Sequence, residues 1–333
     1  MLRAAALLGL AASVAAQAPC FGEFSTCPNG SCALTLDACA RCPAAQYACP
    51  LSTACFAPGD NGAGFSTCPG LAGTHFDTAL TIAQRLDYIF ATPWTAAEFI
   101  SQMTENATDV PRLSIPRYSW LNDDQHGVKE ADATAFPNGV SFGATFDAAL
   151  LHEIGLAVGT EARGTHNALT DKSAETGGKQ WPGTIDNGGG LTLYAPNINL
   201  VHDPRWGRAQ EVPGECPLLT GALMSSYVRG LQNNSALIDD AGTLLTVACA
   251  KHFAVYNIEN IPHSRQYINV DMSGRDLWET YLPAFEALLV DGQVQSIMCS
   301  YNSLNSIPTC ANGGPMDTIA RKTFGFQGFV VSD

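Results

Sequence analysis

From about residue 80 onward, the apolar positions of the sequence repeat alternately with the period of a helix and that of a strand. Spacings of three and four residues predict helices over 146–169, from 217 through at least 231, over 273–289 and over 315–323. Pro217 suits the first position of its helix, and Ser273 with Asp276 three residues later has the pattern of a capping box. Short apolar runs predict strands over 191–200, 244–250, 294–299 and 329–332.

Alternating strands and helices predict an α/β fold with a parallel sheet, either open and doubly wound or closed as a (β/α)8 TIM-type barrel. Polar residues follow successive strands: Lys251–His252, Tyr301–Asn302 and Asp333. In a barrel the carboxyl ends of all strands share one face, on which active sites are built. No GxGxxG motif of a dinucleotide-binding sheet opens any predicted helix. We therefore predict the barrel.

The N-terminal segment has the pattern of a targeting sequence. Arg3 precedes an apolar run, Ala4 to Ala16, that is too short to span a bilayer and ends in small residues. This pattern predicts a signal peptide over residues 1–16. No later stretch supplies the roughly 20 apolar residues of a membrane helix. We expect a secreted protein with no membrane association after signal removal.

Cysteines are concentrated near the N-terminus: eight of the 12 fall within residues 20–68. In an oxidising compartment, an even and dense cluster predicts a disulfide-stapled module, because so short a segment buries little apolar core. A zinc site is the alternative, but Cys39-Ala-Arg-Cys42 is the only CxxC. We predict a small disulfide-rich module over 17–75, of open connectivity and role, followed by a second domain over 80–333.

The charge balance and the missing motifs narrow the function. With 17 Lys+Arg against 31 Asp+Glu, the formal net charge of −14 argues against nucleic acid as a partner, because that binding depends on basic residues. The HExxH and GxxxxGK[ST] motifs of zinc proteases and phosphate-binding loops are absent from the sequence. Carboxylates, basic groups and aromatics remain, and they suit the binding of sugar hydroxyls. No cofactor and no metal site are indicated.

Each polar cluster also has a purely structural explanation. Asp333 after a strand can cap a following helix, and Lys251–His252 can be a solvated lysine beside a core histidine. Asp123 to His126 can form an Asx turn. A last alternative is structural ion pairing of two arginines with two glutamates, namely Arg205 and Arg208 with Glu211 and Glu215.

Six segments nevertheless occur in one order between residues 110 and 333. They are Asp123-x-x-His126-Gly127, Ala195-Pro-Asn-Ile-Asn199, Asp203-Pro-Arg-Trp-Gly-Arg208, Lys251-His-Phe253, Met298-Cys-Ser-Tyr-Asn302 and Val331-Ser-Asp333. Together they resemble glycoside hydrolase family 3. The resemblance implies a retaining, exo-acting hydrolase that needs no cofactor and acts on an oligosaccharide or polysaccharide.

The resemblance also implies roles for individual residues. Asp333 is the implied nucleophile, and the implied substrate-binding residues are Asp123, Arg208, Lys251, His252 and Tyr301. Lys251, His252 and Arg208 are expected to favour the ionised form of Asp333 and to donate hydrogen bonds to sugar hydroxyls. Asp123 is expected to accept from the hydroxyls farthest from the scissile bond, and Tyr301 to lie near the nucleophile.

Two segments, 113–118 and 301–310, resemble the β-xylosidase and α-L-arabinofuranosidase branch of the family more than the β-glucosidases. Asp123 stands where that branch typically has Glu, which leaves room for a larger sugar and keeps a β-glucosidase as the alternative. Cys216 stands where the family usually has Asp. Cys299 and Cys310 are a candidate disulfide pair across their loop.

The family's acid/base glutamate belongs to a second domain that follows the barrel, and no residue of this sequence is nominated for that role. The sequence ends at Asp333, so we expect a barrel truncated before its last strands, either a fragment or an incomplete gene model, and inactive by itself. A non-catalytic carbohydrate-binding protein is a further alternative. The oligomeric state is left open.

Overall fold

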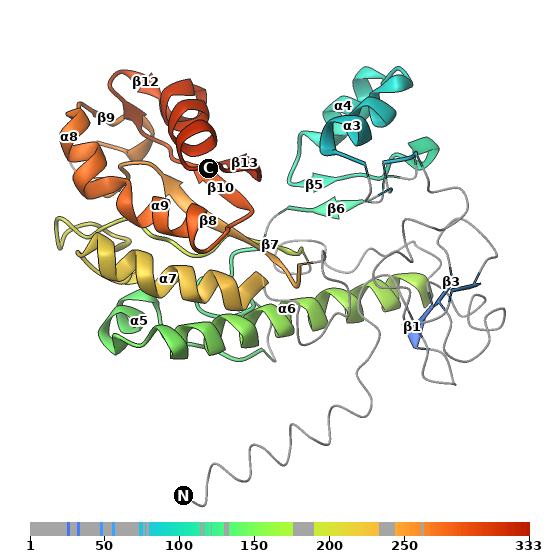
Figure 1. Cartoon of the computed structure of the whole chain (residues 1–333), viewed down its shortest axis with the longest axis horizontal. Helices are drawn as coiled ribbons and strands as arrows, with labels where there is room; N and C mark the ends of the chain where they lie inside the picture. The colour runs from blue at the N-terminus through green and yellow to red at the C-terminus, as the bar shows by residue number, and fades with distance from the viewer. Residues whose placement is uncertain are drawn as a thin grey trace, which may run out of the picture. The chain divides into compact units, whose positions relative to one another are not determined.

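The computed structural model describes residues 73–75, 77, 80–113, 115, 117–120, 122–129, 133–175, 190–232, 244–260 and 263–333, together with four short strands nearer the N-terminus (Figure 1). The described residues fall into two units. The first unit holds the described residues up to Arg117 and the last turns of one helix from Asn167, and the second holds the rest. The predicted signal peptide, and most of the predicted disulfide-rich module, lie outside the described residues.

The first unit contains short strands and two helices. Strand β1 (Ser25–Thr26) pairs antiparallel with β2 (Cys32–Ala33), and β3 (Tyr47–Ala48) pairs likewise with β4 (Cys55–Phe56). They are followed by α3 (Ile82–Ala91), α4 (Ala96–Gln102), β5 (Asn106–Ala107) and the 3-10 turn η1 (Pro111–Leu113). Each helix begins with a capping box, in which a threonine and the side chain three residues later satisfy otherwise unpaired backbone N–H groups.

The second unit is built on a parallel sheet. Its strands are β7 (Thr192–Leu193), β8 (Val247–Phe253), β10 (Ser296–Cys299) and β13 (Phe329–Ser332), in the spatial order β13-β10-β8-β7. All neighbouring pairs are parallel. The carboxyl ends of the four strands therefore meet at one edge of the sheet, as Figure 1 shows for β8 and β10.

Helices and short elements connect these strands. The helices are α5 (Gly139–Thr145), α6 (Ala148–Glu175), α7 (Pro217–Gln232), α8 (Gly274–Asp276), the π-helical η4 (Leu277–Tyr281), α9 (Pro283–Val290) and the π-helical η6 (Gly314–Thr323). The 3-10 turns are η2 (Ala209–Glu211), η3 (Arg265–Tyr267) and η5 (Thr309–Ala311). The remaining strands are β6 (Tyr118–Ser119) and a small sheet of β9 (Asn269–Val270), β11 (Ser303–Leu304) and β12 (Ile307–Pro308).

Glycines let helices α6 and α7 approach each other closely. A Cβ atom added at Gly230 in α7 would collide with the carbonyl of His152 in α6, and one at Gly155 would collide with the carbonyl of Tyr227. The two backbones therefore touch directly. The core between helices and sheet is apolar, and residues such as Phe253, Phe285 and Ile297 are fully buried in it.

The structure confirms the α/β class, whereas closure into a (β/α)8 barrel remains a prediction. α7 begins at Pro217 as predicted. Strand β8 lies three residues later than expected, so that Lys251 and His252 form part of the strand. The strand predicted over 191–200 is regular only at β7, and the helix predicted over 273–289 is divided into α8, η4 and α9. Among the described helices, none combines the length and apolarity that crossing a membrane requires.

Candidate active site

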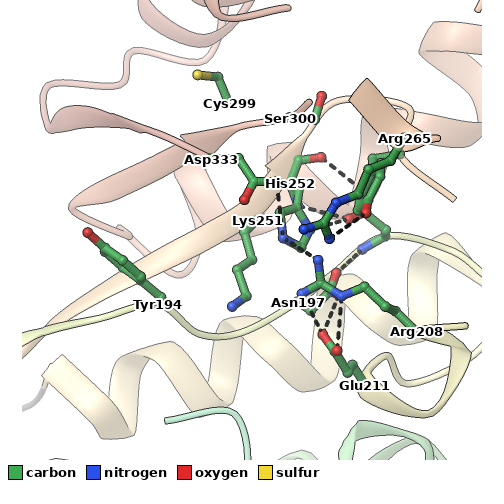
Figure 2. Close-up of polar contacts among 12 residues, drawn as sticks. Tyr194, Asn197, Arg208, Glu211, Lys251, His252, Arg265, Cys299, Ser300 and Asp333 are labelled. Atoms are coloured by element: carbon green, nitrogen blue, oxygen red, sulfur yellow. Dashed lines mark hydrogen bonds and ion pairs between the residues drawn. The ribbon is translucent and has the colours of Figure 1, made fainter. Parts of the chain in front are cut away.

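Three strand ends bring the candidate residues together (Figure 2). Lys251 and His252 lie near the C-terminal end of strand β8, and Asp333 directly follows β13. The backbone N–H of Asp333 donates to the carbonyl of Cys299 at 3.2 Å, which continues the ladder between β10 and β13. The hydrogen bonding of the sheet therefore fixes the backbone position of Asp333.

The Asp333 carboxyl group is mostly buried, with 14% of its side chain exposed. Its Oδ2 lies 3.8 Å from Nε2 of His252 and accepts no hydrogen bond from the described residues. Burial raises the pKa of Asp333. Four groups oppose this effect without overcoming it: Arg208, Arg265, Lys251 and the hydroxyl of Tyr301. The cationic neighbours do favour the ionised form, as expected, but their effect on the pKa is smaller than the effect of desolvating the carboxylate.

Lys251 is the deepest charge of the site, with only 4% of its side chain exposed. Its Nζ donates to Oδ1 of Asp123 at 2.9 Å. The Asp123 side chain is 49% exposed, so the ion pair joins a buried ammonium to a solvated carboxylate. The contact spans 128 positions of the sequence and brings two predicted substrate-binding residues together.

Arg208 lies in the loop after β7 and is held on two sides, as Figure 2 shows. Its Nε and Nη2 donate to the two carboxylate oxygens of Glu211, at 2.9 and 2.8 Å. Nδ2 of Asn197 donates to the same carboxylate at 3.0 Å. Burial would raise the pKa of Glu211, but these partners, Arg208 above all, hold it below its ordinary value. The Arg208–Glu211 pair that the sequence suggested is thus present, within the site itself.

The remaining guanidinium nitrogen of Arg208, Nη1, lies 3.0 Å from Nε2 of His252. The His252 side chain is 1% exposed. Its pKa lies well below its ordinary value, first because of burial and then because of three nearby cations: Lys251, Arg208 and Arg265. His252 is therefore neutral at physiological pH.

Arg265 is a member of the site that the sequence did not reveal. It lies in η3, and its guanidinium stands 4.2 Å from the ring centre of Tyr301, a cation–π contact. Its Nη1 donates to Glu259 at 2.6 Å. An arginine in a loop distant from the strand ends carries no periodic signal, so only the folded chain identifies it.

Tyr301 follows β10 within a loop that a disulfide closes. Cys299 and Cys310 form this bond, as the sequence suggested, with Cα atoms 5.1 Å apart. The bond ties the end of β10 to η5 and so restrains the intervening residues, Tyr301 among them. Among the described cysteines, Cys216 is a free thiol at the surface and Cys249 a free thiol in the core.

A pocket of about 650 Å³ adjoins the ion pairs. Its polar lining includes Asp123, His126, Lys129, Asn138, Gln210 and Glu211. The pocket is large enough for a sugar ring, and its lining includes carboxylates, a lysine and amides. Asp333 is not among its lining residues, and Asp123 and Glu211 link the pocket to the ion pairs.

All six predicted site residues thus lie within one network: Asp123, Arg208, Lys251, His252, Tyr301 and Asp333. The roles assigned to them remain predictions. Arg205, by contrast, pairs with Asp203 at the surface, at 2.5 Å. The pair is solvent-exposed and contributes no group to the network.

One further motif has a packing explanation. Gly139-Val-Ser-Phe-Gly143 has the GxSxG spacing of a serine nucleophile elbow. All five residues lie within helix α5 rather than at a strand-to-helix turn. A Cβ at Gly139 or Gly143 would collide with the carbonyls of Glu211 and Pro213, so the two glycines serve close packing.

Several known proteins resemble this chain in sequence and in fold. A β-xylosidase/α-L-arabinofuranosidase from Medicago sativa subsp. varia is 36% identical over 251 residues, which cover 72% of this chain and 30% of the relative. The solved structure of a GH3 exo-β-xylosidase with a xylobiose aziridine activity-based probe matches with a TM-score of 0.64 and 31% identity, over 77% of this chain and 32% of the other.

A third match is β-glucosidase 3B from Thermotoga neapolitana, solved with α-D-glucose, with a TM-score of 0.53 and 29% identity over 68% of this chain and 28% of the other. The chain spans about a third of the length of the curated relatives it matches. Residues 167–333 match the family model for the glycosyl hydrolase family 3 N terminal domain. The chain therefore belongs to glycosyl hydrolase family 3.

Proposed function

We propose that this chain supplies the nucleophile of a secreted, retaining exo-glycosidase that removes terminal sugars from oligosaccharides or polysaccharides. One observation carries the proposal. Asp333 is a buried carboxyl group at a strand end, among cations, and its Oδ2 accepts no hydrogen bond from the described residues. A carboxylate oxygen that is desolvated and free of hydrogen bonds is suited to attack an anomeric carbon.

The surrounding groups support this role. In a retaining mechanism one carboxylate attacks the sugar and forms a covalent glycosyl-enzyme, which water then hydrolyses. Arg208, Arg265 and Lys251 each lower the pKa of Asp333 against the effect of burial. These cations favour the ionised form that attacks the sugar, although burial outweighs them and leaves the pKa of Asp333 above its ordinary value.

Lys251 and Asp123 are the proposed contacts to sugar hydroxyls. Their side chains meet beside the pocket, one as a donor and one as an acceptor. A pair of this kind can bind vicinal hydroxyls by exchanging part of its ion pair for charge-assisted hydrogen bonds. Tyr301 would place an aromatic face against the sugar ring.

We propose a β-xylosidase/α-L-arabinofuranosidase as the activity, with a β-glucosidase as the alternative. The names of the matched plant relatives and of the structure with the xylobiose-derived probe support the first. The shorter Asp123 and the match to a glucose-bound β-glucosidase support the second. We further propose that the sheet belongs to a (β/α)8 barrel and that the acid/base residue lies outside these 333 residues.

Covalent trapping tests the proposed nucleophile. A 2-deoxy-2-fluoro-β-xylosyl or -glucosyl derivative with an activated leaving group needs no acid catalyst to react, and the fluorine slows hydrolysis of the adduct. A folded chain that lacks the acid/base residue, and therefore turns over no ordinary glycoside, should still be labelled. We expect the intact mass to rise by one fluoro-sugar and the label to lie on the C-terminal tryptic peptide, residues 323–333. Asp333→Asn should remain unlabelled.

The two reagents also separate the two activities. Faster labelling by the fluoro-xyloside supports the xylosidase, and faster labelling by the fluoro-glucoside supports the glucosidase. A wild-type chain that is folded yet labelled by neither reagent contradicts the proposed function.

A further inference from the structure

Asn199 binds both main-chain polar groups of His252. Asn199 is buried in the loop that follows β7 and runs beside β8. Its Nδ2 donates to the carbonyl of His252 at 2.9 Å, and its Oδ1 accepts from the N–H of His252 at 2.8 Å. A peptide N–H only donates and a carbonyl only accepts, so these two bonds determine which end of the amide is the oxygen.

The same oxygen determines the protonation of the imidazole ring. Oδ1 of Asn199 lies 3.0 Å from Nδ1 of His252. An amide oxygen only accepts, so Nδ1 must carry the proton. Nη1 of Arg208 lies 3.0 Å from Nε2. A guanidinium only donates, so Nε2 must be unprotonated. Both sides of the ring require the same neutral tautomer.

The surroundings of the ring disfavour a second proton. The ring is buried, and the charged groups around it include three cations, Lys251, Arg208 and Arg265. The carboxyl group of Asp333 is the nearest opposite charge, and at 3.8 Å its Oδ2 is too far from Nε2 for a hydrogen bond. The neutral ring is thus compatible with every charge that faces it.

We propose that Asn199 is a positioning residue, which holds His252 as the neutral Nδ1–H tautomer so that Nε2 accepts from Arg208 and orients its guanidinium toward Asp333. His252 then has no Nε2 proton to donate to a sugar hydroxyl, unlike the role that the sequence suggested. This inference rests on the proposed function in one respect, because it takes Asp333 as the nucleophile whose surroundings Arg208 completes.

Asn197, two residues earlier in the loop, provides a matched control. Its Nδ2 donates to Glu211, which binds the opposite side of the Arg208 guanidinium. The loop therefore orients Arg208 twice, through Glu211 and through His252. Only the second route determines the histidine tautomer.

Nitrogen NMR of the whole 333-residue chain, labelled with ¹⁵N-histidine, tests the proposal directly. The His252 signals are identified as those lost in His252→Gln. We expect Nδ1 at the shift of a protonated ring nitrogen and Nε2 at that of an unprotonated one, unchanged from about pH 8 to about pH 6. A protonated Nε2, or an imidazolium at neutral pH, would overturn the proposal.

The variants separate the two routes. Asn199→Ala should shift both His252 nitrogen signals. It should also lower the rate constant of fluoro-sugar trapping by about 10- to 100-fold, with a smaller effect on reagent binding. Asn197→Ala should leave the His252 signals unchanged. Unchanged signals in Asn199→Ala would refute the proposal. If the wild-type chain shows the expected tautomer but is not labelled, the proposed function fails while the tautomer assignment stands.

Discussion

Strands β8 and β13 both end in the candidate site, but their surroundings differ. β8 has parallel neighbours on both sides, and the polar groups of Lys251 and His252 all have partners. β13 has β10 as its one neighbour in the described sheet and alternates between half-buried and exposed residues. Asp333 directly follows it, and Oδ2 of Asp333 accepts no hydrogen bond from the described residues.

The difference separates two tasks within one site. Groups that orient their neighbours must be rigid, and a hydrogen-bond partner for each polar group restrains them. A group that attacks must keep a lone pair available, so its hydrogen bonds are left incomplete. The central strand carries the first kind of group and the outer strand of the described sheet carries the second.

Removing one partner of the Arg208–Glu211 ion pair should have the largest effect on stability. Glu211→Gln leaves Arg208, with 17% of its side chain exposed, without its charged partner. We expect the free energy of unfolding of the second unit to fall by about 3–5 kcal/mol, as when one member of a buried ion pair is removed. Urea denaturation measures this change.

The exposed pair Arg275–Glu279 is the control, and Glu279→Gln should cost about 0.5 kcal/mol or less. Equal losses in Glu211→Gln and Glu279→Gln would show that the site pair gains nothing from its burial.

Packing should differ between the strands as well. Ile297 in β10 is register partner of Val330 in β13, but Ile297 is fully buried and Val330 is exposed. Ile297→Ala should lower the free energy of unfolding by about 2–5 kcal/mol because it leaves a cavity in the core. Val330→Ala should cost about 1 kcal/mol or less. A larger loss at Val330, in the same urea titrations, would place β13 within the core.

Removing the buried ammonium group of Lys251 tests whether the end of β8 binds the sugar. Lys251→Met should weaken binding of the fluoro-sugar reagents by about 10- to 100-fold, since hydrogen bonds from a charged group are lost. Stability should change little, because the partner carboxylate of Asp123 is half exposed. The concentration dependence of trapping measures the binding. Lys322→Met, at an exposed lysine, should leave it unchanged, and unaltered binding in Lys251→Met would remove Lys251 from the sugar site.

The two strand ends should also impose opposite pH dependences on stability. The pKa of Asp333 is raised from its ordinary 3.8, so its contribution is fully present below that value and is lost as pH rises through the folded pKa. The pKa of His252 is lowered, so its contribution is present above 6.5 and is lost as pH falls through the folded pKa.

Unfolding titrations from about pH 3 to about pH 8 measure both slopes. Asp333→Asn should abolish the first and His252→Gln the second. A slope that survives its substitution belongs to another group.

Several features of this molecule follow from local sequence alone. Pro217 begins α7 because its ring suits the first helical position, and Ser273 caps α8 by accepting from the N–H of Asp276. The apolar runs located the strands because a buried parallel strand must be apolar on both faces. Polar residues placed at the strand ends then predicted where the site lies.

Boundaries and partners were decided by the tertiary structure. β8 continues through Lys251 and His252, although both are polar, because Asp123, Asn199 and Arg208 satisfy them there. The apolar residues of segment 194–200 predicted a strand, but although the segment is buried, most of it is irregular.

The sequence by itself determined the α/β class, the six residues that gather in the candidate site and the family resemblance, because these depend on local periodicity and on motifs in order. The tertiary structure alone brought Arg265 to Tyr301 and Asn199 to His252, and it alone set the pKa of Asp333 above its ordinary value. Burial and contacts between distant segments are properties of the folded chain, and no local pattern encodes them.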